Sequence, residues 1–73
     1  MKLVYFTAIK KTQHYVEEHE GEVPWSEVVA VIFQAAKNMR KKGEKLEIET
    51  DSYYLLLELK ENILYVINAK RKG

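Results

Sequence analysis

Alternation of apolar and polar residues marks the second half of the chain. Residues 46–50 read Leu-Glu-Ile-Glu-Thr, which is the two-residue period of a half-buried strand. A fuller apolar run follows, then a polar Lys-Glu-Asn turn, then a second alternating run that reaches Ala69. Short polar connections between such runs are typical of antiparallel strands. We therefore predict three strands in a meander, over residues 45–50, 53–60 and 63–69.

The opening of the chain combines a β-prone run with a helical repeat. Leu3 to Phe6 is rich in residues that favour strands, and we predict a strand over residues 2–6. Thr7 is a suitable N-cap for a helix and Gly21 a suitable stop. Between them, steps of three and four residues separate Ile9, Thr12, Tyr15, Val16 and His19. This period predicts a first helix over residues 8–19.

A wider apolar stripe predicts a second helix over residues 24–41. Pro24 suits the first helical position, and the basic residues before Gly43 suit the last turn. Helical spacing relates Trp25, Val28, Val29, Ile32, Ala35, Ala36 and Met39. This stripe should supply most of the helical part of the core.

The resulting order is β-α-α-β-β-β, which predicts the α+β class. An apolar helix stripe and a sheet with one apolar face each need a partner layer. We therefore predict two helices packed on one face of a mainly antiparallel sheet. The 73 residues fit a single domain over 1–73, whose core is small for its surface.

Composition excludes several classes of protein. There is no cysteine, so disulfides, thiolate metal sites and thiol catalysis are excluded, and a cytoplasmic location is expected. The longest apolar run, Val28 to Phe33, is too short for a membrane span, and the opening run is too short for a signal peptide. The formal net charge is +1, so no overall field indicates a partner. Abundant Lys and Glu give the composition a thermophile-like character.

His14 is the one candidate for proton transfer, because histidine titrates near neutral pH. His19 follows five residues later, which on a continuous helix places the two rings about 140° apart. A metal site needs three or four converging ligands, and the chain offers too few, so no metal site is predicted. The three glycines are isolated, so no phosphate-binding loop and no small-molecule cofactor are expected either.

Basic and aromatic residues suggest a surface for nucleic acid. Basic residues are concentrated between Lys37 and Lys45, and Lys70, Arg71 and Lys72 form a second basic run near the end of the sequence. Such cations hold phosphates, and tyrosines on strands stack on bases. The candidate RNA- or phosphate-binding residues are Lys45, Lys70, Arg71, Tyr53 and Tyr65.

The chain resembles the small RelE/BrnT-type toxin fold and a related family of short proteins. Thr12-Gln13-His14 matches a T-x-H motif, and the segment from Pro24 to Val29 resembles the start of the second helix in that family. The last strand, from Leu64 to Ala69, is also similar. The resemblance implies RNA cleavage, often on the ribosome, and an antitoxin partner. Where that family has arginines in the first helix, this chain has glutamates. As a whole, the chain also looks like short archaeal proteins.

The T-x-H motif and the periodicity place the start of the first helix differently. The motif starts it at residue 12, whereas the helical repeat starts it at residue 8. We take the start at residue 8, because a shorter helix would leave Ile9 outside the core.

Two functions are compatible with these features. The first is a non-enzymatic interaction domain, homodimeric or bound to a protein partner, because the core is small and the second helix very apolar. The alternative is a RelE/BrnT-like RNA-binding or ribonuclease domain, in which His14 transfers the proton. We prefer the first, and no catalytic motif predicts an enzyme.

Overall fold

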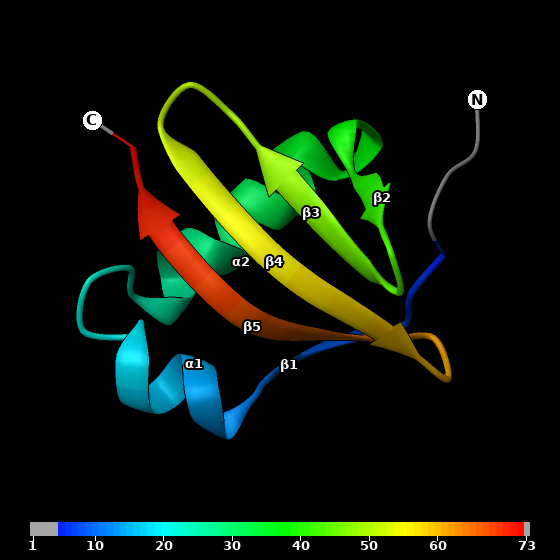
Figure 1. Cartoon of the computed structure of the whole chain (residues 1–73), viewed down its shortest axis with the longest axis horizontal. Helices are drawn as coiled ribbons and strands as arrows, with labels where there is room; N and C mark the ends of the chain where they lie inside the picture. Colours follow the sequence, from blue (N-terminus) through cyan, green and yellow to red (C-terminus); the bar gives the residue numbers. More distant parts are fainter. Residues whose placement is uncertain (1–4, 73) are drawn as a thin grey trace.

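The computed structural model describes residues 5–72, in which a five-stranded sheet carries two helices (Figure 1). The elements are β1 (Ala8–Lys11), α1 (Gln13–Glu18), α2 (Trp25–Ala35), the 3-10 turn η1 (Ala36–Asn38), β2 (Arg40–Lys42), β3 (Lys45–Glu49), β4 (Tyr53–Lys60) and β5 (Ile63–Arg71). The strand order is β1-β5-β4-β3-β2, with β1 parallel to β5 and every other pair antiparallel. The predicted α+β class and mainly antiparallel sheet are confirmed.

The core lies between the sheet and α2. Alternate strand residues face the helix and are buried, and they include Leu46, Ile48, Leu55, Leu57, Leu64, Val66 and Ala69. From the helix side, α2 contributes four buried residues, whereas α1 contributes Tyr15. The second helix therefore supplies most of the helical core, as its wide stripe predicted.

The first strand and the first helix differ from the prediction. Residues 2–4 of the predicted strand 2–6 lie outside the described residues, and Tyr5 and Phe6 are not in a strand. The strand is instead β1, whose backbone pairs with β5, and Ile9 reaches the core from this strand. The predicted helix over residues 8–19 is therefore wrong in its first half. The T-x-H start is the correct one, because pairing with a distant strand outweighed the local helical period.

Thr12 joins β1 to α1. Its hydroxyl accepts a hydrogen bond from the Tyr15 amide at 3.1 Å, as an N-cap does, and donates to the Val66 carbonyl at 2.7 Å. The Thr12 amide also donates to Val66, at 3.2 Å. One side chain thus begins the helix and fixes it to β5.

Replacing Thr12 by alanine should lower the free energy of unfolding by about 1–2 kcal/mol, because both the cap and the bond to β5 are lost. Chemical denaturation followed by circular dichroism measures this change. Thr12→Ser keeps the hydroxyl and should lose much less. Equal losses in the two variants would contradict the capping role.

The second helix is shorter than predicted. It ends at Ala35, and the basic segment forms η1 and then β2 rather than a helix to residue 41. Gly43 does not end a helix but lies in the turn that joins β2 to β3. Its φ is 63°, which glycine adopts at little cost. At the β4–β5 turn, Glu61 and Asn62 have φ values of 50° and 64°, as a tight hairpin requires.

Candidate functional site

In the part of the chain that the structure describes, no helix lies over the centre of the sheet face opposite α2, and we call this face the open face (Figure 1). It is defined by the strand residues that alternate with the core residues. Its charged members are Lys10, Arg40, Lys42, Lys45, Glu47, Glu49, Glu58, Lys60 and Lys70, and the Lys72 side chain reaches it through Glu49. Tyr54, Leu56 and Tyr65 lie between these charges as a half-buried floor.

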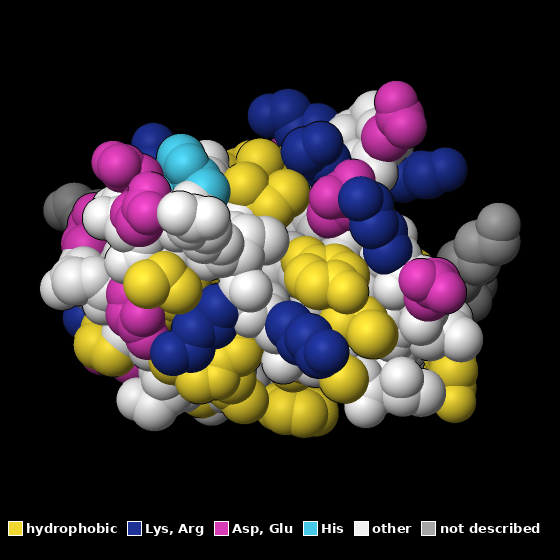
Figure 2. All heavy atoms as spheres, turned by 90° about the horizontal axis from the view of Figure 1, so that it is seen from below, with side chains coloured by type: hydrophobic (Ala, Val, Ile, Leu, Met, Phe, Trp, Pro, Cys, Tyr) yellow, Lys and Arg dark blue, Asp and Glu magenta, His cyan; other side chains and the backbone are white. Residues whose placement is uncertain are grey.

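Positive charge predominates on the open face. Among residues 5–72 it carries seven Lys or Arg side chains against three carboxylates. Lys10, Lys45 and Lys70 have no carboxylate within 4.0 Å in this part of the chain. Figure 2, with the open face at the top, shows Lys and Arg side chains gathered at the upper right and acidic side chains beside a histidine at the left. The nearly neutral chain thus has one strongly basic surface.

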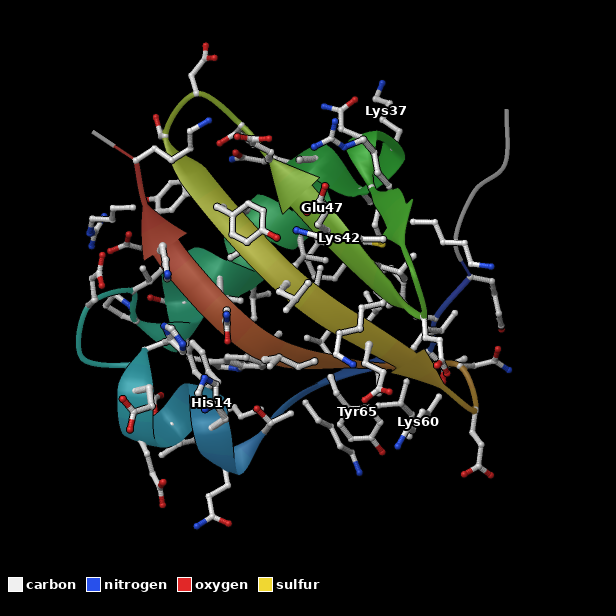
Figure 3. All side chains as sticks on the ribbon, viewed as in Figure 1. His14, Lys37, Lys42, Glu47, Lys60 and Tyr65 are labelled. Carbon is white, nitrogen blue, oxygen red and sulfur yellow. The ribbon has the colours of Figure 1, made fainter. Side chains whose placement is uncertain are left out.

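Glu47 organises the β2–β3 side of this face. Its carboxylate accepts hydrogen bonds from Arg40 at 3.1 Å and from the Tyr54 hydroxyl at 2.7 Å, and Lys42 lies 3.7 Å away (Figure 3). Burial, followed by the hydrogen bond to Glu47, raises the pKa of Tyr54 to about 12. Tyr54 therefore remains a proton donor at physiological pH, and Glu47 forms ion pairs with two exposed cations of the face.

His14 borders the open face, where α1 lies beside β5 (Figure 3). The prediction that His14 and His19 do not face each other is wrong, since their Nε2 atoms are 3.2 Å apart. The 140° separation applies to a continuous helix, but α1 ends at Glu18 and His19 has non-helical torsions. His14 is exposed, whereas His19 is 8% exposed.

The predicted phosphate-binding residues separate onto two faces. Lys45, Lys70 and Tyr65 lie on the open face together with cations that the prediction did not single out, such as Lys60. Tyr53 and Arg71 are cross-strand neighbours on the α2 side. Alternation alone along β5 would have placed Arg71 on the face of Tyr65, six positions away, but a register shift opposite Leu56 and Leu57 reverses the alternation, so Lys70 shares the face of Tyr65 instead.

Arg71 and Tyr53 join the sheet to the start of α2. The Arg71 guanidinium lies 2.8 Å from a Glu27 carboxylate oxygen and donates to the Glu22 carbonyl at 3.2 Å. The Tyr53 hydroxyl donates to Glu27 at 2.6 Å. Hydrogen bonds from Arg71 and Tyr53 lower the pKa of Glu27, and the bond to Glu27 raises the pKa of Arg71. The charges and hydrogen-bonding groups of Arg71, Tyr53 and Glu27 are thus paired with one another within the fold. The open face is therefore the better candidate for binding a ligand.

The Glu27 cluster should make stability depend on pH. The folded pKa of Glu27 is below its ordinary value of 4.5. The ionised carboxylate therefore stabilises the fold at pH values above 4.5, and this stabilisation is lost as the pH falls through the folded pKa. The stability difference between the wild type and Glu27→Gln should therefore shrink from about pH 6 to about pH 3. Urea denaturation at the two pH values measures it, and Glu44→Gln, in the exposed β2–β3 turn, is the control. A difference independent of pH would contradict this role.

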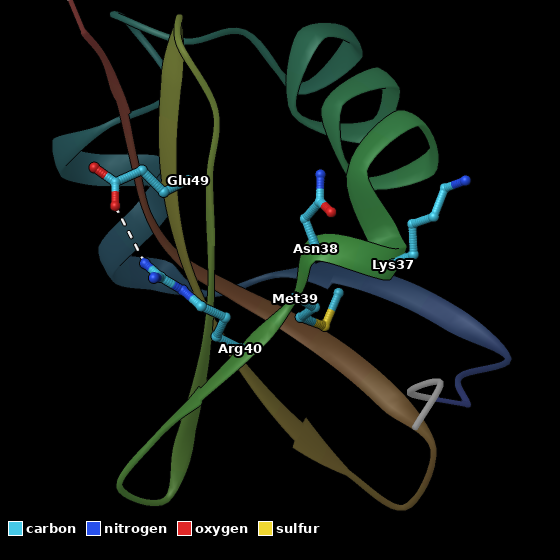
Figure 4. A pocket seen from close by; sticks show the side chains of 5 residues that line it. All are labelled: Lys37, Asn38, Met39, Arg40 and Glu49. Atoms are coloured by element: carbon cyan, nitrogen blue, oxygen red, sulfur yellow. Dashed lines mark hydrogen bonds and ion pairs between the residues drawn. The ribbon is translucent and has the colours of Figure 1, made fainter. Parts of the chain in front are cut away.

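A hollow of about 390 Å³ lies between η1 and the edge of the sheet (Figure 4). Lys37, Asn38, Met39, Arg40 and Glu49 line it. Arg40 donates to Glu49 at 3.2 Å, and Lys72 lowers the pKa of Glu49 by its hydrogen bond. The ionised carboxylate neutralises much of the positive charge here, so the hollow suits an anionic ligand less well than the open face does.

An apolar groove lies on the α2 side of the sheet, away from the open face. It has a volume of about 350 Å³ and lies between α2 and the segment around β1. Phe33, which is 68% exposed, packs against Phe6 with ring centroids 6.4 Å apart, and Trp25 and Val29 continue the apolar lining. In Figure 2, hydrophobic side chains gather along the lower edge, on the side of α2. Within residues 5–72, the strand β1 beside the groove pairs only with β5.

Comparison with known proteins places the fold in a class. No family model and no curated protein matches the chain. Among solved structures, the fold is similar to a chain of the RelBE2 toxin–antitoxin complex of Mycobacterium tuberculosis. The TM-score is 0.62 over 97% of this chain and 95% of that one, at 13% sequence identity. The chain therefore shares its α+β fold with that chain. No helix among residues 5–72 is long and apolar enough to cross a membrane.

Proposed function

We propose that the protein is a toxin-type RNA-binding domain that binds the RNA backbone on its open face. The excess of seven cations over three carboxylates on that face carries the proposal. Tyr65 lies between Lys10 and Glu58 on the same surface, where a base can stack on its ring. The structural similarity to a toxin–antitoxin complex supports this function over a purely structural role.

In the ribonuclease form of this proposal, His14 is the general base. RNA bound across the open face brings a ribose near the His14 imidazole beside β5, and this imidazole accepts a proton. His14 takes the proton of the 2′-hydroxyl, the 2′-oxygen attacks the adjacent phosphorus, and the bond to the 5′-oxygen breaks. The leaving oxygen takes a proton from water, which gives a 2′,3′-cyclic phosphate and a 5′-hydroxyl.

Fluorescence anisotropy with a single-stranded RNA oligonucleotide tests the RNA-binding proposal. The double variant Lys45→Ala/Lys70→Ala should bind at least about tenfold more weakly than the wild type, because two unpaired cations leave the open face. The matched control Lys37→Ala/Lys41→Ala removes the same charge from η1 and from the other side of β2, and should lose less. Equal losses would indicate attraction by overall charge alone, and undetectable wild-type binding would reject the proposal.

The apolar groove favours a second candidate function, which is docking of a protein partner. Phe33 exposes a large apolar surface beside β1, whose outer edge has unpaired backbone groups among the described residues. An extended segment of a partner protein such as an antitoxin would pair with this edge and cover the groove. Co-purification with the product of a neighbouring reading frame tests this function. Phe33→Glu should abolish the complex, whereas Lys45→Ala/Lys70→Ala should preserve it, and a complex that tolerates Phe33→Glu would contradict docking here.

A further inference from the structure

The two histidines of the chain converge at the end of α1. Their Nε2 atoms lie 3.2 Å apart, and their ring planes are inclined at 59° with centroids 5.0 Å apart. The rings therefore meet edge to edge through nitrogen rather than stacking face to face. A single hydrogen bond between the two nitrogens accounts for this geometry. A cation bound by both nitrogens in place of the bridging proton accounts for it equally well.

The backbone fixes His19 in this position. Its amide donates to the Tyr15 carbonyl at 2.8 Å, and its carbonyl accepts from Glu22 at 3.0 Å and Val23 at 2.9 Å. The residue is 8% exposed, so its ring has little freedom. His14 is exposed on the first turn of a helix that Thr12 caps. One ring is thus fixed and the other is accessible, so a small ion can reach the pair from solvent.

The spacing matches two ligands on one metal ion. Zinc binds imidazole nitrogen at about 2.0–2.1 Å, so two such nitrogens lie about 2.9 Å apart at a right angle and about 3.4 Å apart at the tetrahedral angle. The observed 3.2 Å falls between these two limits. An ion can therefore bind without moving either ring appreciably.

We propose that His14 and His19 form a binding site for a divalent late transition-metal ion, with Zn²⁺ as the reference ion. Imidazole favours Zn²⁺, Ni²⁺ and Cu²⁺ over Mg²⁺ and Ca²⁺, which prefer oxygen ligands. No group of three or more His, Cys, Asp or Glu side chains among residues 5–72 is arranged to hold a metal. Water therefore fills the other positions, and the site is open rather than closed like a structural zinc site. It adds a metal-binding property to a domain whose proposed partners are RNA and protein.

Isothermal titration of the RNA-free protein with zinc chloride tests the site. The wild type should bind one ion per chain, and His14→Ala should weaken binding at least about tenfold, because a single imidazole remains. His14 is exposed, so this variant should fold, and circular dichroism verifies that it does. Glu18→Gln, which removes a carboxylate from the same helix, is the matched control and should bind like the wild type.

Copper titration followed by electron paramagnetic resonance gives an independent measurement. Two equivalent nitrogen ligands should be visible in the wild type, and one or none in His14→Ala. The absence of zinc binding to the wild type would overturn the proposal, as would a His14→Ala variant that binds zinc like the wild type. Because RNA is absent from both experiments, their failure leaves the RNA-binding function standing, and the converse also holds.

Discussion

Replacing Leu57 by alanine lowers the free energy of unfolding by about 2–5 kcal/mol. Leu57 is 0% exposed and lies on β4, which is flanked by β3 and β5, opposite α2. Truncation removes buried methyl groups and leaves a cavity that strands paired on both sides cannot close. Domains of this size are stable by only about 4–11 kcal/mol, so the variant should be partly unfolded at moderate temperature.

Leu59→Ala is the matched control, since Leu59 lies on the same strand and is 36% exposed. It should lose less than half as much stability as Leu57→Ala, because less surface returns to water. Urea denaturation followed by circular dichroism measures both variants. Similar losses would mean that the two positions are equally buried in solution, and would contradict the assignment of Leu57 to the core.

Raising the salt concentration from about 50 to about 200 mM should weaken single-stranded RNA binding by about 50-fold. The open face has four more cations than carboxylates among residues 5–72. If each excess cation replaces one counterion, the logarithm of the affinity falls with the logarithm of salt at a slope of about −2.8. Anisotropy titrations at several salt concentrations give this slope.

The Lys45→Ala/Lys70→Ala variant should reduce that slope by about half, because two of the four excess charges are removed. Binding that is insensitive to salt would mean that phosphate contacts contribute little. In that case apolar stacking, centred on Tyr65, would have to account for the affinity.

Much of the sheet could be predicted from local sequence. The predicted strand over residues 53–60 coincides with β4, and β3 and β5 differ from prediction at their ends, because alternation and tight turns are encoded within a few residues. The first half could not be predicted in this way. Residues 8–11 have a helical repeat, yet they form a strand because β5, more than fifty residues away, pairs with them. The short strand β2 likewise depends on pairing with β3.

Composition alone identified the basic and aromatic residues but not their grouping. Strand pairing, including the register shift opposite Leu56 and Leu57, decides which side chains share a face, and it places Lys45 on the face of Lys70 and Arg71 beside Glu27. The contact between His14 and His19 depends on a helix end that no helical repeat reveals. The proximity of groups in the candidate site thus follows from tertiary pairing.

The position of β5 has a consequence for synthesis of the chain. This strand follows the other four described strands along the chain, yet it lies between β1 and β4 and pairs with both (Figure 1). A nascent chain that ends before residue 63 lacks the strand that joins the β2–β3–β4 hairpins to the N-terminal strand. Closure of the sheet must therefore wait until β5 has emerged from the ribosome, so the open face is completed only after β5 has been translated.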